Sequence, residues 1–66
     1  MSQELLAIIE QMEREKGIKK EVLIQAVESA LVSAAKKVID FKPEEELKVE
    51  IDRNSGKIRA TRNGQE

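Results

Sequence analysis

The sequence predicts an α+β fold in which two packed helices lie over a short antiparallel β-hairpin. Up to about residue 39, apolar residues recur at helical spacing. After Pro43 they alternate with charged residues, as in a half-buried strand, and residues 52–56 have the composition of a turn before a second alternating run. We therefore expect one small domain over residues 1–62 and a frayed tail at residues 63–66.

The first predicted helix covers Ser2 to Lys16. Four apolar residues at i, i+3, i+4 and i+7 fall on one of its faces: Leu5, Ile8, Ile9 and Met12. Ser2 is expected to cap the N-terminus. Gly17 suits the left-handed position that ends a helix, and Ile18 suits the apolar contact that follows it.

The second predicted helix runs from about Lys20 to Ile39 and is more apolar. One stripe along it is formed by Leu23, Val27, Ala30, Ala34 and Val38, and a neighbouring stripe by Ile24, Leu31 and Ala35. A helix that is apolar over so wide an arc must be covered on two sides. We expect the first helix on one side and the sheet on the other. Lys19 stands where a capping residue would help.

The hairpin is predicted from alternation on both sides of a turn. Leu47, Val49 and Ile51 alternate with charged residues, and Ile58 and Ala60 continue the pattern after the turn. Gly56 suits a positive φ in that turn. The most buried residues of the whole chain are expected to be Leu5, Ile9, Leu23, Val27, Leu31, Val49, Ile51 and Ile58.

Composition argues against catalysis and against a bound metal or cofactor. The 66 residues include no His, Cys, Trp or Tyr, so the commonest general base and the thiolate ligands are missing. The spacing of Asp52, Asn54 and Gly56 resembles the start of a calcium-binding loop, but the closing bidentate glutamate is absent. The run from Glu44 to Glu46 is typical of a solvated linker. We expect neither an enzyme nor a metal site.

Charge and hydropathy limit the classes of partner. Twelve basic and 13 acidic residues give a net charge of −1, whereas a domain that coats nucleic acid is usually strongly basic. No apolar run reaches the ~18 residues of a membrane span. The N-terminus also lacks the order of a signal peptide, so a cytoplasmic location is expected.

Two pairs of residues are candidate contact sites, each with a structural alternative. Lys36 and Lys37 end the second helix, where cations also complement the helix dipole. Val22 and Val32 lie outside the apolar stripes and could mark the rim of a docking surface, although single exposed valines are ordinary.

Three blocks of the sequence resemble the N-terminal part of the NusA family. The first is Leu5 to Glu10 followed by Glu15 to Ile18, and the second is Glu21 to Leu31 followed by Ala34 to Lys37. The third is Val49 to Gly56, and the resemblance covers about residues 1–62. This family is a bacterial elongation factor that promotes pausing and intrinsic termination and takes part in antitermination.

The resemblance implies a non-catalytic domain that docks on RNA polymerase at the RNA exit channel. Its partner there would be the flap-tip helix of the polymerase β subunit, received near Val22 and Val32. Lys36 and Lys37 would contact nascent RNA weakly. The family's RNA-binding S1 and KH modules lie further along the full protein.

The chain departs from the family pattern at Lys19, where the family usually has a capping residue or proline. The family also has an aromatic-containing strand after the hairpin. Without that strand, we expect a weak homodimer formed by edge-to-edge pairing or by exchange of the hairpin. The alternative function is a free-standing nucleic-acid-binding or dimerising domain without a polymerase role.

Overall fold

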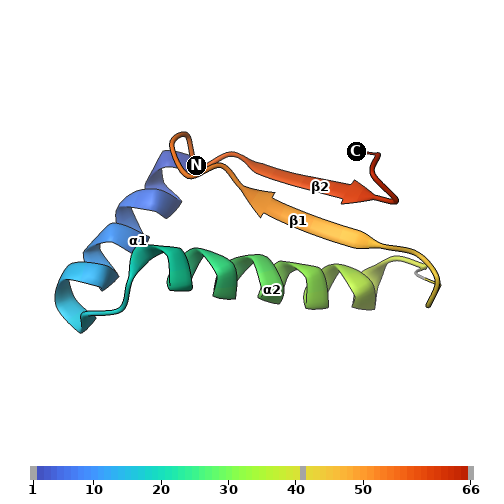
Figure 1. Ribbon diagram of the computed structural model, residues 1–66, viewed down its shortest axis with the longest axis horizontal. Coiled ribbons are helices and arrows are strands. Elements are labelled where there is room, and N and C mark those ends of the chain that lie inside the picture. The colour runs from blue at the N-terminus through green and yellow to red at the C-terminus, as the bar shows by residue number, and fades with distance from the viewer. Residues whose placement is uncertain (1, 41, 66) are drawn as a thin grey trace.

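The computed structural model describes residues 2–40 and 42–65. Helix α1 covers Ser2–Lys16 and helix α2 covers Lys20–Val38. Strands β1 (Leu47–Ile51) and β2 (Ile58–Arg62) follow and form a two-stranded antiparallel sheet (Figure 1). The predicted α+β class is confirmed.

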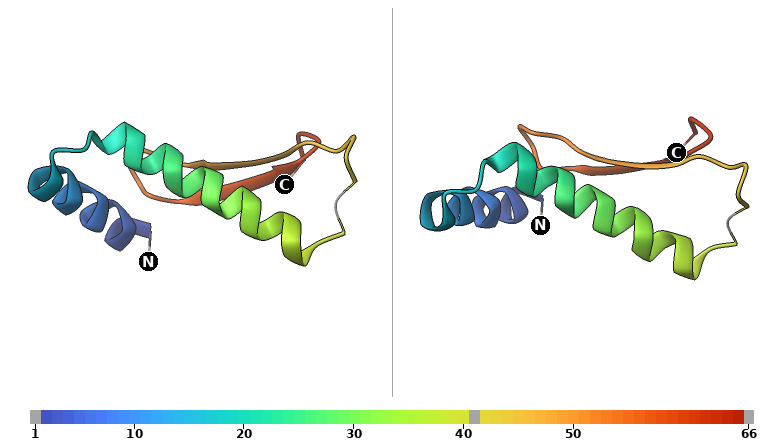
Figure 2. Two further views of the ribbon diagram at one scale, coloured as in Figure 1. Left: turned by 90° about the horizontal axis from the view of Figure 1, so that it is seen from below. Right: turned by 60° about the horizontal axis from the view of Figure 1, so that its bottom comes forward.

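Helix α2 is the central element of the fold. It runs along the hairpin and packs on β1, while β2 lies on the far side of β1 (Figure 1). Helix α1 leaves α2 at a steep angle near the hairpin turn, so the second half of α2 extends beyond it (Figure 2). As predicted, α2 contacts α1 on one side and the sheet on another.

The core lies where α1, α2 and β1 meet. Its buried residues are Leu6, Ile9, Ile24 and Ile51, and Leu5, Leu23 and Val27 pack against them. Ile24 has no exposed surface at all. Because α1 and β1 cover α2 from two directions, the residue between them, Ile24, is the most enclosed.

The predicted list of buried residues is right in part. Ile9, Val49 and Ile51 are buried, as expected. Leu5, Leu23, Val27 and Leu31 are only half-buried, and Leu6 and Ile24 were missing from the list. The prediction that Ile58 is buried was wrong, because 53% of this residue is exposed. The expected stripe of α2 is also exposed in its second half, at Ala30, Ala34 and Val38, since α1 does not reach that far.

The junction of the helices shows how the missing cap is replaced. Gly17 has the predicted positive φ, 70°, and its N–H donates to the Glu13 carbonyl. Lys19 makes no side-chain cap bond, in line with its sequence. Instead the Glu13 carboxylate accepts the Lys20 N–H at 2.7 Å, so α1 caps α2. The side chain of Ser2 lies outside what the structure describes, and Ile18 is partly exposed.

The hairpin turn forms as its composition predicts. The Asp52 carboxylate accepts the N–H groups of Asn54 and Ser55, both at 2.8 Å, and Gly56 has φ 76°. The strand register sets Ile51 opposite Ile58 and Val49 opposite Ala60. Only the β1 members of these pairs are buried, because α2 lies under β1 and not under β2.

The tail begins with an ordered turn, where the sequence led us to expect a frayed end. Asn63 and Gly64 both have positive φ, and Gln65 forms a bridge with Arg62. The Asn63 side chain also accepts the Glu46 N–H at 2.8 Å. Residues 63–65 are thus tied to the sheet, while Glu66 lies outside the described residues.

Candidate docking surfaces

Arg53 in the hairpin turn fixes α2 against the sheet. Its guanidinium donates to Glu21 at 2.6 Å and to Glu28 at 2.7 Å. Glu28 lies about two helical turns beyond Glu21 on α2. Glu28 in turn accepts the Ile51 N–H at 2.8 Å, and Arg53 also donates to the Ile51 carbonyl. We call this cluster of Glu21, Glu28, Ile51 and Arg53 the Arg53 clamp, and it joins α2 to the hairpin.

The clamp favours the charged form of each of its ionisable members. The hydrogen bond from Arg53 lowers the pKa of Glu21 and of Glu28 below the usual 4.5. The Ile51 N–H lowers the pKa of Glu28 further. The two carboxylates raise the pKa of Arg53. The clamp is therefore fully charged at neutral pH.

A second ion pair holds the other end of the hairpin. Arg62 donates through Nε and Nη2 to the Glu45 carboxylate and, at 2.5 Å, to the Asp40 carbonyl. These bonds join β2 to the segment that follows α2. The Arg62 hydrogen bond also lowers the pKa of Glu45.

The structure does not bring the two candidate valines together. Val22 is 53% exposed near the start of α2. Val32 is half-buried beside Leu47 and Val49, in an open hollow of about 370 Å³ between α2 and β1. Ten residues of helix separate them by about 15 Å along the axis and about 80° around it.

Lys36 and Lys37 lie in the last turn of α2, and both are exposed. Consecutive helical residues point about 100° apart, so the two ammonium groups face different directions. The helix ends just beyond them, where the Ile39 N–H donates to the Ala35 carbonyl at 3.1 Å. The pair is thus placed both to contact an outside anion and to complement the helix dipole.

An uncovered face of β2 was not anticipated from the sequence. Ile58 and Ala60 lie opposite Ile51 and Val49 and so point to the same face of the sheet. On β1 this face is covered by α2, but on β2 both residues are exposed. Other apolar residues with exposed side chains are Ile8, Met12 and Val38. The sequence signal for this exposure was the small number of apolar residues in the second alternating run, which has only Ile58 and Ala60.

Other features of the described residues give no sign of a metal site. In residues 2–40 and 42–65, no group of three or more His, Cys, Asp or Glu side chains gathers around one point.

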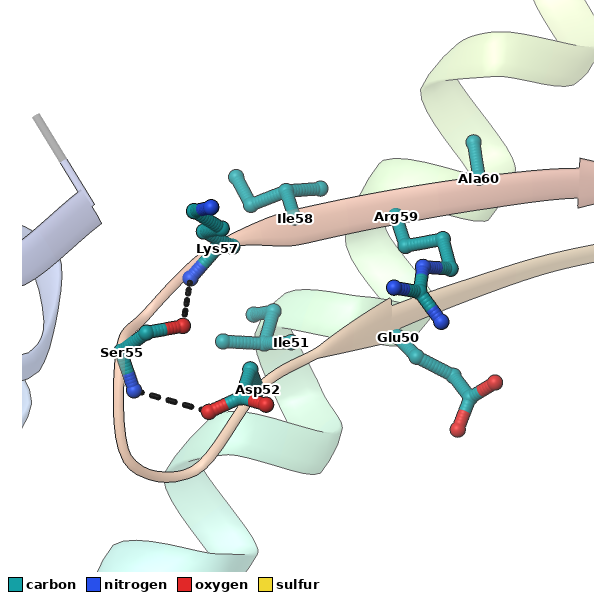
Figure 3. A pocket seen from close by; sticks show the side chains of 8 residues that line it. All are labelled: Glu50, Ile51, Asp52, Ser55, Lys57, Ile58, Arg59 and Ala60. Carbon is teal, nitrogen blue, oxygen red and sulfur yellow. Dashed lines mark hydrogen bonds between the residues drawn. The ribbon is translucent and has the colours of Figure 1, made fainter. Parts of the chain in front are cut away.

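A shallow hollow at the hairpin turn is lined by Ser55, Lys57, Ile58 and Arg59, among others (Figure 3). In the same ranges no helix is both long and apolar enough to cross a membrane.

The fold and its surfaces define a small α+β domain whose candidate contact residues lie on open helix and strand surfaces. Residues 4–65 match the family described as the NusA N-terminal domain. The chain therefore belongs to the NusA N-terminal domain family.

Curated relatives agree with this family. The chain is 44% identical over 59 residues to the transcription termination/antitermination protein NusA of Bacillus subtilis (strain 168). It is 39% identical to the NusA of Halalkalibacterium halodurans and 42% identical to that of Rickettsia conorii (strain Malish 7), again over 59 residues. Each match covers 89% of this chain but only 11% to 15% of the relative. The chain thus spans a small part of their length.

Proposed function

We propose that this domain is a non-catalytic module of a transcription termination/antitermination factor and that it docks on RNA polymerase near the RNA exit channel. The observation that carries the proposal is the family match over residues 4–65. The relatives are named transcription termination/antitermination proteins. Through this contact the domain would modulate pausing, termination and antitermination in the cytoplasm.

The docking mode that we propose is a helix laid on α2, with the polymerase β-flap-tip helix as the partner. The open hollow beside Val32 offers an apolar floor made by Leu47 and Val49. Val22 provides an exposed apolar contact about 15 Å away along α2. A helix of about ten residues spans this distance, so one short helix crossing α2 obliquely would reach both valines.

An NMR titration with a flap-tip peptide tests this docking mode. Amide resonances around Val22 and Val32 should shift, and Val22→Glu should weaken binding at least about fivefold because it places a charge in an apolar contact. Val38→Glu is the matched control, since Val38 is an exposed valine on the same helix. The mode is wrong if no resonance on either helix moves, or if both variants weaken binding equally.

The accessory contact in the proposal joins Lys36 and Lys37 to exiting RNA. Two lysines displace about two counterions from RNA. Their contribution to the slope of log binding constant against log salt concentration should therefore be small, about 1.5 in magnitude. The change of both to alanine should reduce RNA crosslinking in a paused transcription complex without unfolding the domain. A double variant Lys19→Ala with Lys42→Ala is the control, because both residues are exposed. If both double variants lose RNA crosslinking equally, the two lysines are better explained as complementing the helix dipole.

A further inference from the structure

We propose that Glu28 is a positioning residue for docking: through its bonds to Arg53 and Ile51 it holds α2 against β1 beside the hollow that would receive the partner helix. This role rests on the proposed docking of a helix on α2 and deepens it. Glu28 would set the shape of the docking surface without contacting the partner itself.

The hollow beside Val32 has walls from two elements. It is lined from α2 by Gln25, Glu28, Ser29 and Val32, and from β1 by Leu47, Lys48 and Val49. A partner helix that contacts Val32 together with the floor of Leu47 and Val49 must touch both elements at once. Its affinity therefore depends on how α2 lies relative to β1.

Glu28 lies between the core and this hollow. Ile24 of the core, Glu28 and Val32 follow one another at intervals of four residues, so each lies about 6 Å further along the same side of α2. Helix α1 packs on the first half of α2 and does not extend along its second half (Figure 2). Between the core and Val32, Glu28 binds the backbone of β1.

The Glu28 carboxylate is used inside the fold. It accepts the Ile51 N–H at 2.8 Å and an Arg53 N–H at 2.7 Å, and Arg53 also donates to the Ile51 carbonyl at 2.6 Å. Ile51 lies two residues from Val49 on the same strand. The carboxylate thus ties α2 directly to the strand that forms the floor of the hollow.

Glu21 is the natural comparison, because it binds the same guanidinium. The Glu28 side chain is 17% exposed, whereas the Glu21 side chain is 54% exposed. Exposed ion pairs contribute little, and hydrogen bonds gain strength where water is excluded. Glu28 also bonds to the backbone of β1, so it should hold α2 on the strand more firmly than Glu21 does.

Apolar packing also keeps α2 near β1, since Val49 is buried and Val27 and Leu31 are half-buried. Apolar burial is not directional, whereas a hydrogen bond requires one distance and one direction. Loss of the Glu28 carboxylate should therefore leave the chain folded and let α2 shift on β1 near Val32.

The free chain tests this role without a partner. Methyl–methyl NOEs from Val32 to Leu47 and Val49 should be lost in Glu28→Ala, while the NOE between Ile24 and Ile51 remains. Glu21→Ala is the matched control and should keep all of them. Retention of the Val32 NOEs in Glu28→Ala would overturn the positioning role.

Titration with the flap-tip peptide measures the consequence for docking. Glu28→Ala should weaken binding roughly fivefold, as substitutions that act at a distance from a ligand can do, and Glu21→Ala less than about twofold. Glu28→Gln should fall between the unchanged chain and Glu28→Ala, because its amide oxygen can still accept the Ile51 N–H. It also keeps the comparison measurable if the alanine variant does not fold.

The remaining outcomes separate this role from the docking proposal. If Glu28→Ala lowers the urea midpoint but binds the peptide with unchanged affinity, Glu28 stabilises the fold and does not position the surface. If the unchanged chain binds no peptide, the docking proposal fails, and the NOEs of the free chain still decide whether Glu28 holds α2 on β1.

Discussion

Ile24 is the residue at which the three packed elements meet, and it has no exposed surface. Its neighbours Leu23 and Val27 belong to the same apolar arc but are only half-buried. The difference arises because the arc of α2 is covered from two directions, and Ile24 lies between them. Stability should therefore depend on Ile24 more than on any other residue of this helix.

Ile24→Ala is expected to lower the free energy of unfolding by about 3 kcal/mol, because it removes buried methyl groups and leaves a cavity. Ile24→Val should cost about 1 kcal/mol and keeps the comparison measurable if the alanine variant does not fold. Val38→Ala is the control, since Val38 is 82% exposed, and it should change stability by less than about 0.5 kcal/mol. Urea unfolding measures all three. Similar losses at both positions would contradict the core described above.

The elements are joined by two ion-pair clusters, the Arg53 clamp at the turn and Arg62 with Glu45 at the other end of the hairpin. Both connect segments that are far apart in sequence. Glu28 is the more important carboxylate of the clamp, because it is less exposed than Glu21 and also receives the Ile51 N–H.

Stability should fall with acidification because the pKa of Glu28 is lower in the folded chain than in the unfolded one. Between the two values the unfolded chain binds more protons, so protonation favours unfolding. The contribution of the clamp is complete above the ordinary pKa of 4.5 and is lost as the pH falls through the lowered value. Glu21, Glu45 and Asp52 shift in the same direction and add to the effect.

Urea midpoints between about pH 6 and about pH 3 measure this loss. Glu28→Gln should be less stable than the unchanged chain at pH 6 and should lose less on acidification. Glu50→Gln is the control, because Glu50 is exposed and lies outside the clamp, and its ion pair with nearby Lys48 is long, at 3.7 Å. If Glu28→Gln and the unchanged chain lose equal stability, the clamp does not govern the acid response.

The whole molecule is elongated, with extents of 39 × 20 × 16 Å. Its radius of gyration is 13.2 Å, whereas a compact domain of 66 residues has about 10.8 Å. The cause is visible in the layers: α2 continues past α1, and among the described residues no helix packs closely on the inner face of β2 (Figures 1 and 2).

Self-association through β2 should be weak and should strengthen as salt is added. Symmetric pairing of two β2 strands would place Arg59 of one copy opposite Arg59 of the other, and like charges in that position repel. Salt screens this repulsion. Sedimentation velocity at about millimolar concentration measures the population, and Arg59→Thr should raise it at low salt. A dimer that weakens with salt, or that is unaffected by Arg59→Thr, would point to a different interface.

The sequence by itself determined the features that depend on local chemistry. The bounds of both helices, the alternating strands, the turn at Asp52 to Gly56 and the left-handed Gly17 all follow from spacing and backbone preference. One local signal was overlooked. The Asn63-Gly64 pair is typical of a tight hairpin turn, and it directs Gln65 back along β2.

Only the tertiary structure decided which parts of these elements are covered. Periodicity gives the apolar arc of α2, but the directions from which α1 and β1 approach select Ile24 as its centre. Alternation makes Ile58 equivalent to Ile51, yet α2 lies beneath one strand only, so one is buried and the other exposed. The same placement joins Glu28 to the Ile51 N–H, a contact between residues that are distant in sequence.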